Sequence, residues 1–273
     1  MNEYRDRVVL ITGASSGIGR ACANYLGQKG YRVFGTSRRA PSQEPNSFEM
    51  IVMDVNDEDS IHRGIEIILS QEGRLDVVVN NAGYALAGSV EDTSIAEAQA
   101  QFQTNFFGVV RVCRAVLPTM RNQQDGYIVN VSSIGGLIST PFQGLYCSSK
   151  FALEGFTEAL RGEVQPFGIR VVLIEPGDFH TKITSSRRIA ARTDMNSAYF
   201  DKFNTAIAVV ESDETSGPTP ERIAILLERI INTSKPRLRY LTGSSFQKLA
   251  VSLKKILPYA LFEWWLMKYY KLL

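Results

Sequence analysis

The chain has 273 residues, of which 44% are hydrophobic and 21% charged, and its net charge at pH 7 is +2. These values are typical of a folded globular protein and exclude a mainly disordered or collagen-like chain. The near balance of 30 basic and 28 acidic residues, without a long run of one sign, argues against a nucleic-acid partner.

Short apolar runs rich in β-branched residues alternate with longer helical patterns over the first two thirds of the chain. We predict strands at 7–11, 31–36, 48–53, 75–80, 127–131 and 169–174, and helices at 17–29, 57–71, 95–121 and 146–165. Strands that are apolar on both faces are typical of a buried parallel sheet. Their alternation with helices predicts right-handed βαβ units, and hence an α/β fold with a doubly wound parallel sheet.

The last third of the chain is less regular. We predict a polar segment at 181–194, a helix after 218–220, a last strand at 237–241 and a strongly aromatic ending at 256–273. The sequence contains no internal repeat and no Gly/Ser-rich linker. We therefore expect a single domain over 1–273 with a C-terminal helical extension at 243–273.

The cysteines and the N-terminal segment indicate in which cellular compartment the protein is expected. Three cysteines lie far apart and only two histidines accompany them. This pattern predicts free thiols in a reducing compartment, with no disulfide framework and no zinc or other metal site. We recognise no secretory signal at 1–13, and no run approaches the roughly 18 apolar residues of a spanning helix. The expectation is a cytoplasmic protein.

A glycine-rich turn, TGASSGIG at 12–19, follows the first predicted strand. Glycines at such a turn let the backbone approach a pyrophosphate, and the following helix offers free N–H groups and its positive dipole end. The spacing G-x-x-x-G-x-G differs from the common G-x-G-x-x-G. A glycine turn that binds no phosphate is therefore the alternative. The predicted cofactor contacts in this turn are Gly13, Ser15, Ser16, Gly17, Ile18 and Gly19.

The end of the second predicted strand bears on the choice of cofactor. NAD sites place an acidic residue there for the ribose 2′-hydroxyl, whereas NADP sites place a cation there for the 2′-phosphate. The sequence at 36–39 is TSRR, without an acid. Ser37 and the planar donor fork of Arg38 favour NADP(H), and the alternative is that both arginines are solvated. Asp54, with Val55 beside it, is expected near the adenine amino group.

Tyr146 and Lys150 are four residues apart and share one face of a predicted helix. A tyrosine, with an ordinary pKa of about 10, is a poor base at neutral pH, and a neighbouring ammonium stabilises its phenolate. Ser133, after the predicted strand 127–131, is placed to hydrogen-bond a substrate carbonyl, and Ser132 competes for this role. A lone Y-x-x-x-K pair is common on helices, so its meaning depends on the accompanying motifs.

Taken together, these motifs resemble the short-chain dehydrogenase/reductase family over roughly residues 5–185. The resemblance rests on TGASSGIG at 12–19, NNAG at 80–83, Asn105, Ser133, Tyr146 with Lys150, and Pro176-Gly177 with Thr181. It implies a Rossmann-like fold, an NADP(H)-dependent oxidoreductase and the catalytic tetrad Asn105, Ser133, Tyr146 and Lys150. In such a tetrad Asn105 holds a water beside Lys150, and the thirteen-residue step to Tyr146 favours Ser133 over Ser132.

The resemblance also implies further contacts and properties. Asn81, Ala82 and Gly83 would line the cofactor site. Pro176 and Gly177 would lie under the nicotinamide ring with Thr181 near its carboxamide, and Tyr146 and Lys150 would also touch the cofactor. Homo-oligomerisation is a further expectation. The chain is longer than the minimal domain of the family. In this extension it resembles the branch of hydroxysteroid and retinol dehydrogenases, which act on bulky lipophilic alcohols and ketones.

In this family the segment after Pro176-Gly177 covers the substrate, which here corresponds to a lid at 178–215. Arg187, Arg188 and Arg192 form either a basic rim for an acidic group or part of a solvated amphipathic lid. Apolar residues at helical spacing are expected to pack this lid on the core or on an apolar substrate. These residues are Tyr199, Phe200, Phe203, Ile207 and Val210.

The ending at 256–273 holds six aromatic and three charged residues. It is too short and too charged to span a bilayer. We expect it to pack on the protein and wall the substrate pocket, and the alternative is peripheral contact with a membrane.

The functional hypothesis is an NADP(H)-dependent oxidoreductase acting on a lipophilic alcohol or ketone. The enzyme alternative is a 3-oxoacyl thioester reductase, which the lid arginines would suit. From another class, the alternative is a non-catalytic NADP(H) sensor or membrane scaffold.

Overall fold

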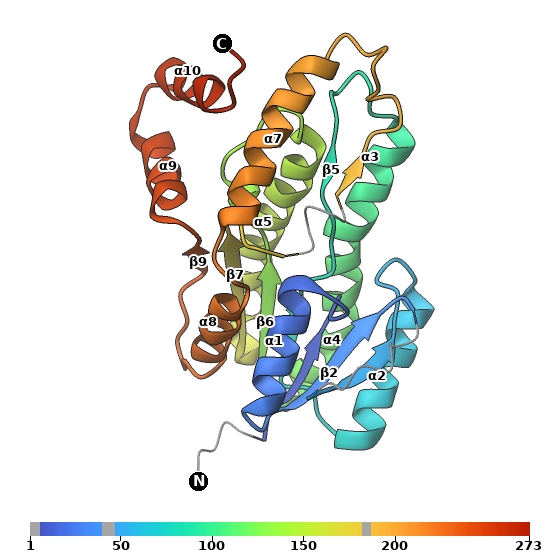
Figure 1. The fold of residues 1–273 in the computed structure, drawn as a ribbon. Coiled ribbons are helices and arrows are strands. Elements are labelled where there is room, and N and C mark those ends of the chain that lie inside the picture. Colours follow the sequence, from blue (N-terminus) through green and yellow to red (C-terminus); the bar gives the residue numbers. More distant parts are fainter. Residues whose placement is uncertain (1–5, 40–46, 182–186) are drawn as a thin grey trace.

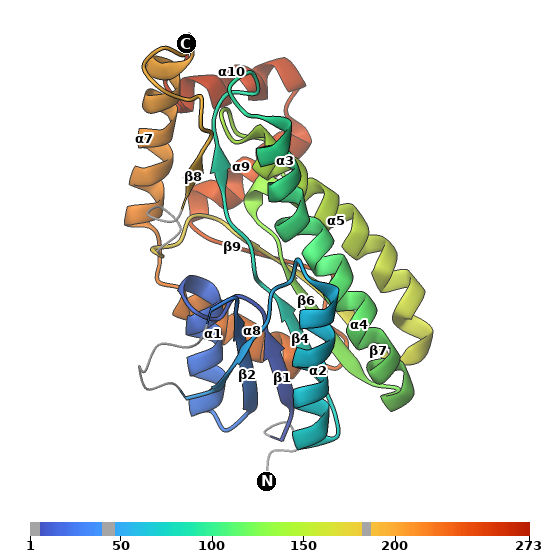
Figure 2. The same ribbon diagram turned by 90° about the vertical axis from the view of Figure 1, so that its right-hand side faces the viewer.

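A seven-stranded parallel sheet with helices on both faces forms the body of the protein (Figures 1 and 2). The computed structural model describes residues 6–39, 47–181 and 187–273. The first residues of the predicted N-terminal segment and residues 182–186 of the predicted lid lie outside these ranges. The α/β fold with a doubly wound parallel sheet is confirmed.

The strand order is β3-β2-β1-β4-β6-β7-β9, and every neighbouring pair is parallel. The strands are β1 (Val8–Ile11), β2 (Arg32–Ser37), β3 (Glu49–Val52), β4 (Val77–Asn80), β6 (Gly126–Val131), β7 (Ile169–Pro176) and β9 (Arg239–Thr242). The chain builds outward from β1 through β2 to β3 and then returns to β4 on the other side. At this reversal the segments that leave the carboxyl ends of the neighbouring strands β1 and β4 diverge to opposite faces of the sheet, and ligands bind at such a point in open α/β sheets.

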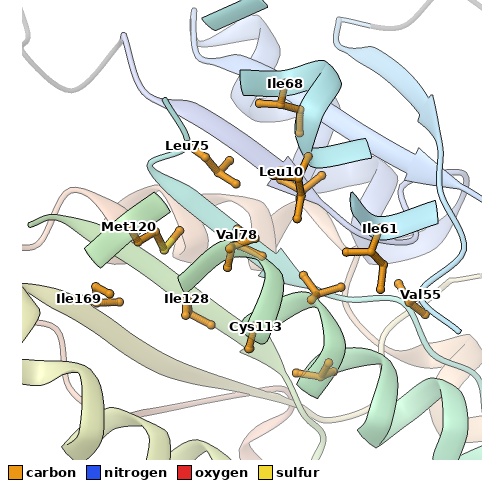
Figure 3. Close-up of a cluster of buried hydrophobic side chains, with 14 of the residues drawn as sticks. Leu10, Val55, Ile61, Ile68, Leu75, Val78, Cys113, Met120, Ile128 and Ile169 are labelled. Carbon is orange, nitrogen blue, oxygen red and sulfur yellow. The ribbon is translucent and has the colours of Figure 1, made fainter. Parts of the chain in front are cut away.

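Two apolar clusters hold the helices on the sheet. One face is covered by α2 (Glu58–Glu72), α4 (Gly108–Gln123) and α5 (Gly144–Val164). The other face is covered by α1 (Gly17–Gln28) and α8 (Glu221–Ile231). Figure 3 shows the first cluster, in which Leu10, Val78 and Ile128 of three strands meet the side chains of α2 and α4. Both faces of the central strands are therefore buried, which explains their continuous apolar runs.

Capping side chains and left-handed glycines set helix boundaries close to the predicted ones. The Asp57 side chain caps α2 by accepting hydrogen bonds from the N–H groups of Asp59 and Ser60. Gly73, with φ of 69°, ends the same helix in the left-handed conformation. Beyond α5, Gly168, with φ of 73°, ends a short 3-10 turn before β7.

The prediction of one continuous helix at 95–121 is wrong, because the helix is interrupted. The structure divides it into α3 (Ile95–Phe102), a π-helical turn at Gln103–Phe107 and α4. The turn carries Asn105, whose side chain accepts a hydrogen bond from the Tyr84 N–H and donates to the Tyr84 carbonyl and the Ser149 hydroxyl. Because these partners lie on other elements, apolar periodicity along the helix does not reveal them.

The structure also contains a two-stranded parallel sheet that the sequence did not predict. It pairs β5 (Leu86–Ala87) with β8 (Arg188–Ile189). Next in the chain comes α7 (Phe200–Ser216), whose buried Phe203, Ile207 and Val210 pack on the body of the protein. The prediction that the lid residues at helical spacing pack on the core is therefore correct for these three side chains, whereas Tyr199 is exposed and Phe200 is half-buried.

The aromatic ending does not form a single helix. The structure has α9 (Ser245–Ile256) and α10 (Tyr259–Tyr269), separated at Leu257 and Pro258. Leu257 has extended backbone, as expected for a residue before proline. Phe262 and Tyr270 are buried, so the expectation that the ending packs on the protein is correct for these side chains. No helix within the described ranges is long and apolar enough to cross a bilayer.

Candidate active site

A cavity of about 570 Å³ opens at the carboxyl ends of β1, β4, β6 and β7. It extends from the glycine turn and the end of β2 to residues of α5, α7 and the C-terminal extension. All the residues predicted as catalytic or cofactor-binding line this cavity except Gly19 and Asn105. The sequence motifs therefore meet in one place although they are spread over 169 positions, from Gly13 to Thr181.

The glycines of the turn stand where a side chain would strain the backbone or clash with neighbouring atoms. Gly13 and Gly17 have φ of 69° and 55°, the left-handed region that favours glycine. A Cβ on Gly13 would lie 2.8 Å from Cα of Ala82, and one on Gly19 would lie 2.4 Å from Nδ2 of Asn81. Gly13 and Gly17 shape the cavity wall, whereas Gly19 allows the first turn of α1 to pack beneath it. The cradle therefore fits the diphosphate of a dinucleotide at a helix N-terminus.

Two side chains brace this cradle from below. The Thr12 hydroxyl accepts hydrogen bonds from the N–H groups of Asn81 and Ala82, both at 3.0 Å. In return, Nδ2 of Asn81 donates to the carbonyl of Thr12 at 2.9 Å and that of Gly13 at 3.1 Å. Asn81 was predicted as a cofactor contact. In the structure its side-chain amide donates to the backbone of the glycine turn.

The far end of the cavity is formed by the ends of β2 and β3. Ser37, Arg38, Asp54 and Val55 all line it. The Asp54 carboxylate accepts from the Asn56 N–H at 2.9 Å, and the Asp54 N–H donates to the Ser60 hydroxyl at 3.0 Å. These bonds fix the Asp54 carboxylate at the cavity wall.

At the other end, Tyr146 and Lys150 come from the first two turns of α5. Burial raises the pKa of Tyr146 above its ordinary value, and a hydrogen bond with Ser133 acts in the opposite direction. The Lys150 ammonium donates to the Val131 carbonyl at 2.9 Å and lies 6.0 Å from the centre of the Tyr146 ring. Burial lowers the pKa of Lys150 to about 8, and the negative charge of Glu154 opposes that shift.

The structure distinguishes Ser133 from Ser132. The Ser133 hydroxyl accepts from the Gly135 N–H at 3.0 Å and hydrogen-bonds Tyr146. Ser132 also lines the cavity, but it is buried and its hydroxyl lies beside the Glu154 carboxylate. The geometry therefore pairs Ser133, and not Ser132, with the tyrosine.

Pro176 ends β7, Gly177 and Thr181 follow it, and all three line the same cavity. A Cβ on Gly17 would lie 3.7 Å from Cβ of Thr181, so the segment after β7 reaches back to the glycine turn. Gly177 donates its N–H to the Thr242 carbonyl at 2.7 Å, which ties this segment to β9.

Sequence reasoning missed a group of acidic residues at the substrate end of the cavity. Asp178, Asp213 and Glu214 line it together with Tyr270 of the C-terminal extension. Burial, with the negative charges of Glu214 and Asp213, raises the pKa of Asp178 to about 7. Asp178 adjoins the Pro176-Gly177 motif, and this was the one local signal. The approach of Asp213 and Tyr270 depends on how α7 and the extension fold back.

The lid arginines do not form one basic rim. Arg187 is nearly buried and pairs with Glu214 at 2.5 Å. Arg188 lines the cavity with its guanidinium 4.1 Å from the centre of the Tyr84 ring. Arg192 is exposed and is not among the residues that line the cavity.

The fold and this site define a protein class. The sequence profile of the short chain dehydrogenase family matches residues 7–191, and the chain belongs to this family. It is therefore an oxidoreductase of the kind that interconverts alcohols and carbonyl compounds with a nicotinamide nucleotide.

Relatives match over almost the whole chain. A 3-ketodihydrosphingosine reductase of Bacteroides thetaiotaomicron is 42% identical over 252 residues, 92% of this chain and 93% of that protein. Human 17-beta-hydroxysteroid dehydrogenase type 1 is 35% identical over 263 residues, 89% of this chain and 79% of that protein. A solved short-chain dehydrogenase from Streptomyces avermitilis is 32% identical with a TM-score of 0.83, covering 97% of each chain. The resemblance to the hydroxysteroid dehydrogenase branch is thus confirmed.

The packing beneath the glycine turn predicts the effect of one added methyl group. Gly19→Ala places a Cβ 2.5 Å from the Gly13 carbonyl oxygen, so the turn must shift. We expect the affinity for NADPH, measured by isothermal titration calorimetry, to fall at least about tenfold. The control is Gly155→Ala in α5, where a Cβ meets nothing within 4 Å. It should bind NADPH like the wild type, and unchanged affinity in Gly19→Ala would contradict our description of the turn.

Burial of the Lys150 ammonium predicts a pH-dependent stability difference. The folded-state pKa of about 8 lies below the ordinary value of 10.5, so below pH 8 the folded protein bears the full cost of the buried charge. We expect Lys150→Met to be more stable than the wild type at pH 7 by about 1–2 kcal/mol, after subtraction of the lost hydrogen bond to Val131. The advantage should shrink between pH 8 and 10.5, as the unfolded chain alone binds this proton.

The measurement is urea denaturation of both proteins across this pH range. Lys202→Met, at an exposed position of α7, is the control and should change the free energy of unfolding at pH 7 by less than about 0.5 kcal/mol. A wild-type stability deficit that stays constant up to pH 10.5 would show that the ammonium is not held in a low-dielectric site.

Proposed function

We propose that the protein is an NADP(H)-dependent reductase of a lipophilic ketone, with Tyr146 as the proton donor and acceptor. The observation that carries this proposal is that Tyr146, Ser133 and Lys150 line the same cavity as the glycine turn. A dinucleotide held by the turn and a carbonyl group held at Tyr146 would share that cavity.

When bound, the nicotinamide nucleotide supplies the hydride that converts the substrate carbonyl to an alcohol. Ser133 orients the carbonyl oxygen by donating a hydrogen bond to it. Burial keeps the Tyr146 phenol protonated in the free protein, so it is ready to donate a proton to that oxygen. The phenolate left behind is stabilised by the nearby Lys150 ammonium, which is why the two residues must share one face of α5.

Lys150 and Asn105 would then reload the tyrosine. An ammonium has three N–H donors, and the Val131 carbonyl takes one of them. The other two are available to the nicotinamide ribose and to a water molecule. The Asn105 side chain is committed to Tyr84 and Ser149. In our proposal it therefore acts on the water through its main-chain carbonyl, at the π-helical turn.

NADP(H) is proposed over NAD(H) because of the residues at the end of β2. Ser37 and Arg38 line the cavity where the adenosine ribose would lie, and no acid stands beside them at 36–39. A planar guanidinium binds a phosphate through paired N–H donors, whereas a 2′-hydroxyl would find no carboxylate there.

For the substrate we propose a long-chain ketone with an amino group near the carbonyl. The 42% identical relative is named for 3-ketodihydrosphingosine, whose amino group is adjacent to its ketone. Asp178, Asp213 and Glu214 line the substrate end of the cavity, where burial, and then the negative charges of Glu214 and Asp213, raise the pKa of Asp178 to about 7. An ammonium group would relieve this repulsion as a proton does. Val210, Phe179 and Tyr270 supply apolar wall for the chain.

A 3-oxoacyl thioester reductase is the second candidate, and the presence of Arg188 at the cavity favours it. Because Arg187 is paired with Glu214, the anionic group of such a substrate would meet Arg188 alone among the three lid arginines. We also propose a cytoplasmic homo-oligomer. The three buried, free cysteines support the reducing compartment, and the family supports the oligomer.

The proposal predicts the behaviour of Tyr146→Phe. NADPH oxidation should be measured with 3-ketodihydrosphingosine, with the same ketone lacking the amino group, and with steroid, retinoid and acyl-thioester carbonyls. We expect the wild type to have its highest kcat/KM with the amino ketone, and Tyr146→Phe to lower kcat by about 10²–10⁴ while it still binds NADPH. Tyr240→Phe, in β9, is the control and should keep the wild-type kcat.

Each other outcome has a definite meaning. Unchanged kcat in Tyr146→Phe would exclude it as the proton donor. A preference for acyl thioesters would favour the second candidate. Tight NADPH binding without turnover of any carbonyl would favour a non-catalytic sensor.

The cofactor choice predicts the effect of Arg38→Ala. Loss of the guanidinium should raise the KM for NADPH by about 10–100-fold and leave the KM for NADH unchanged, since only NADPH carries the 2′-phosphate. The control is Arg63→Ala, at an exposed position of α2. Equal effects of Arg38→Ala on both cofactors, or a wild-type preference for NADH, would overturn the choice of NADP(H).

A further inference from the structure

The C-terminal helices α9 and α10 lie beyond β9, at one edge of the sheet (Figure 1). Each helix has one side packed on the protein. Ala250 and Val251 of α9 join Phe262 of α10 in an apolar cluster with Ile138. Tyr270, directly after α10, packs against α7 and lines the cavity.

The opposite side of these helices is apolar and exposed. Six of the eighteen large hydrophobic side chains that are exposed in the described residues fall between positions 246 and 264. We call them the C-terminal apolar surface: Phe246 (43% exposed), Leu249 (54%), Ile256 (78%), Tyr259 (75%), Leu261 (48%) and Trp264 (51%). Leu249 and Ile256 are seven residues apart and Leu261 and Trp264 are three apart, so each pair shares one helix face. Exposure of this much aromatic and aliphatic surface in one stretch indicates a binding surface.

The charged residues of this part of the chain are almost all positive. Five lysines lie between 245 and 273 against one acid, Glu263, although the whole chain is nearly neutral. Lys248, Lys255 and Lys268 are exposed on the same two helices. The Lys268 ammonium lies 5.1 Å from the centre of the Trp264 ring.

We propose that the C-terminal apolar surface binds the surface of a membrane that contains anionic phospholipids. Trp264 with the Lys268 ammonium over its ring is a combination that sits at the lipid headgroup level, and Tyr259 is a further exposed aromatic side chain of α10. α10 has eleven residues, so it would lie in the plane of the interface with its packed side still on the protein. The exposed lysines would add electrostatic attraction to the anionic headgroups.

The same charges argue against a second copy of this chain as the occupant. In a two-fold symmetric dimer a patch meets itself. Two patches that each carry an excess of lysines would then be brought together, and the like net charges of the patches repel each other. An anionic lipid surface complements both the apolar side chains and the lysines. This inference is independent of the proposed reaction.

The two tryptophans of the chain, Trp264 and Trp265, both lie in α10, so tryptophan fluorescence reports on this helix alone. The full-length protein is titrated with vesicles of phosphatidylcholine alone or mixed with phosphatidylglycerol, and binding is also measured by co-sedimentation. We expect a blue shift of the emission and pelleting with the anionic vesicles, with both effects weakened by high salt.

Ile256→Glu combined with Leu261→Glu should lower the partition coefficient at least about tenfold, because both substitutions place a charge in the interface. Ile225→Glu in α8 is the matched control, since Ile225 is 53% exposed and lies outside the C-terminal apolar surface. It should partition like the wild type. Circular dichroism and thermal denaturation establish that every variant is folded, so the test does not require turnover.

Three outcomes would overturn the proposal. The first is a wild-type protein that does not bind anionic vesicles. The second is an equal loss of binding in Ile225→Glu. The third is sedimentation velocity showing a dimer that Ile256→Glu with Leu261→Glu converts to monomers, which would assign the surface to a second copy.

Discussion

The buried ammonium of Lys150 is the constraint on which the Tyr146 end of the cavity depends. A charged group away from water needs hydrogen-bond partners, and Lys150 has the Val131 carbonyl at the end of β6 and the nearby charge of Glu154. These partners fix α5 against the sheet. Because Tyr146 is one turn earlier on the same face, fixing Lys150 also places the Tyr146 phenol beside Ser133 at the end of that strand.

A second buried ionic group connects the C-terminal part of the chain to this arrangement. Arg239 of β9 pairs with Glu154 of α5 at 3.0 Å and with Glu175 of β7 at 3.0 Å. Glu154 therefore acts on Lys150 from one side and is neutralised by Arg239 from the other. The extension that follows β9 then returns to the cavity through Tyr270. The helix α5, the sheet edge and the extension are thus electrostatically and sterically linked.

The motifs of the first 181 residues could be recognised because each reflects a constraint between residues that are close in sequence. A glycine is required at Gly13 and Gly17 by the backbone conformation, and the four-residue step from Tyr146 to Lys150 puts both on one helix face. The break at Gln103–Phe107 could not be recognised in this way. It depends on Asn105 reaching the backbone of Tyr84 and the hydroxyl of Ser149, which lie 21 and 44 positions away. The pairing of Arg187 with Glu214 in the lid is similarly non-local.

The sequence by itself determined the fold class, the glycine turn and the placing of Tyr146 and Lys150 on one helix face, because strand burial, backbone conformation and helix spacing act between neighbouring residues. Only the tertiary structure decided that Ser132 lies beside Glu154, that Asp213 and Glu214 meet Asp178 at the cavity, and which aromatic residues of the ending are buried. Each of these depends on contacts between elements far apart in the chain. Phe262 and Trp264 are two residues apart in one helix, yet the first is 3% and the second 51% exposed, because the neighbouring elements cover only one side of α10.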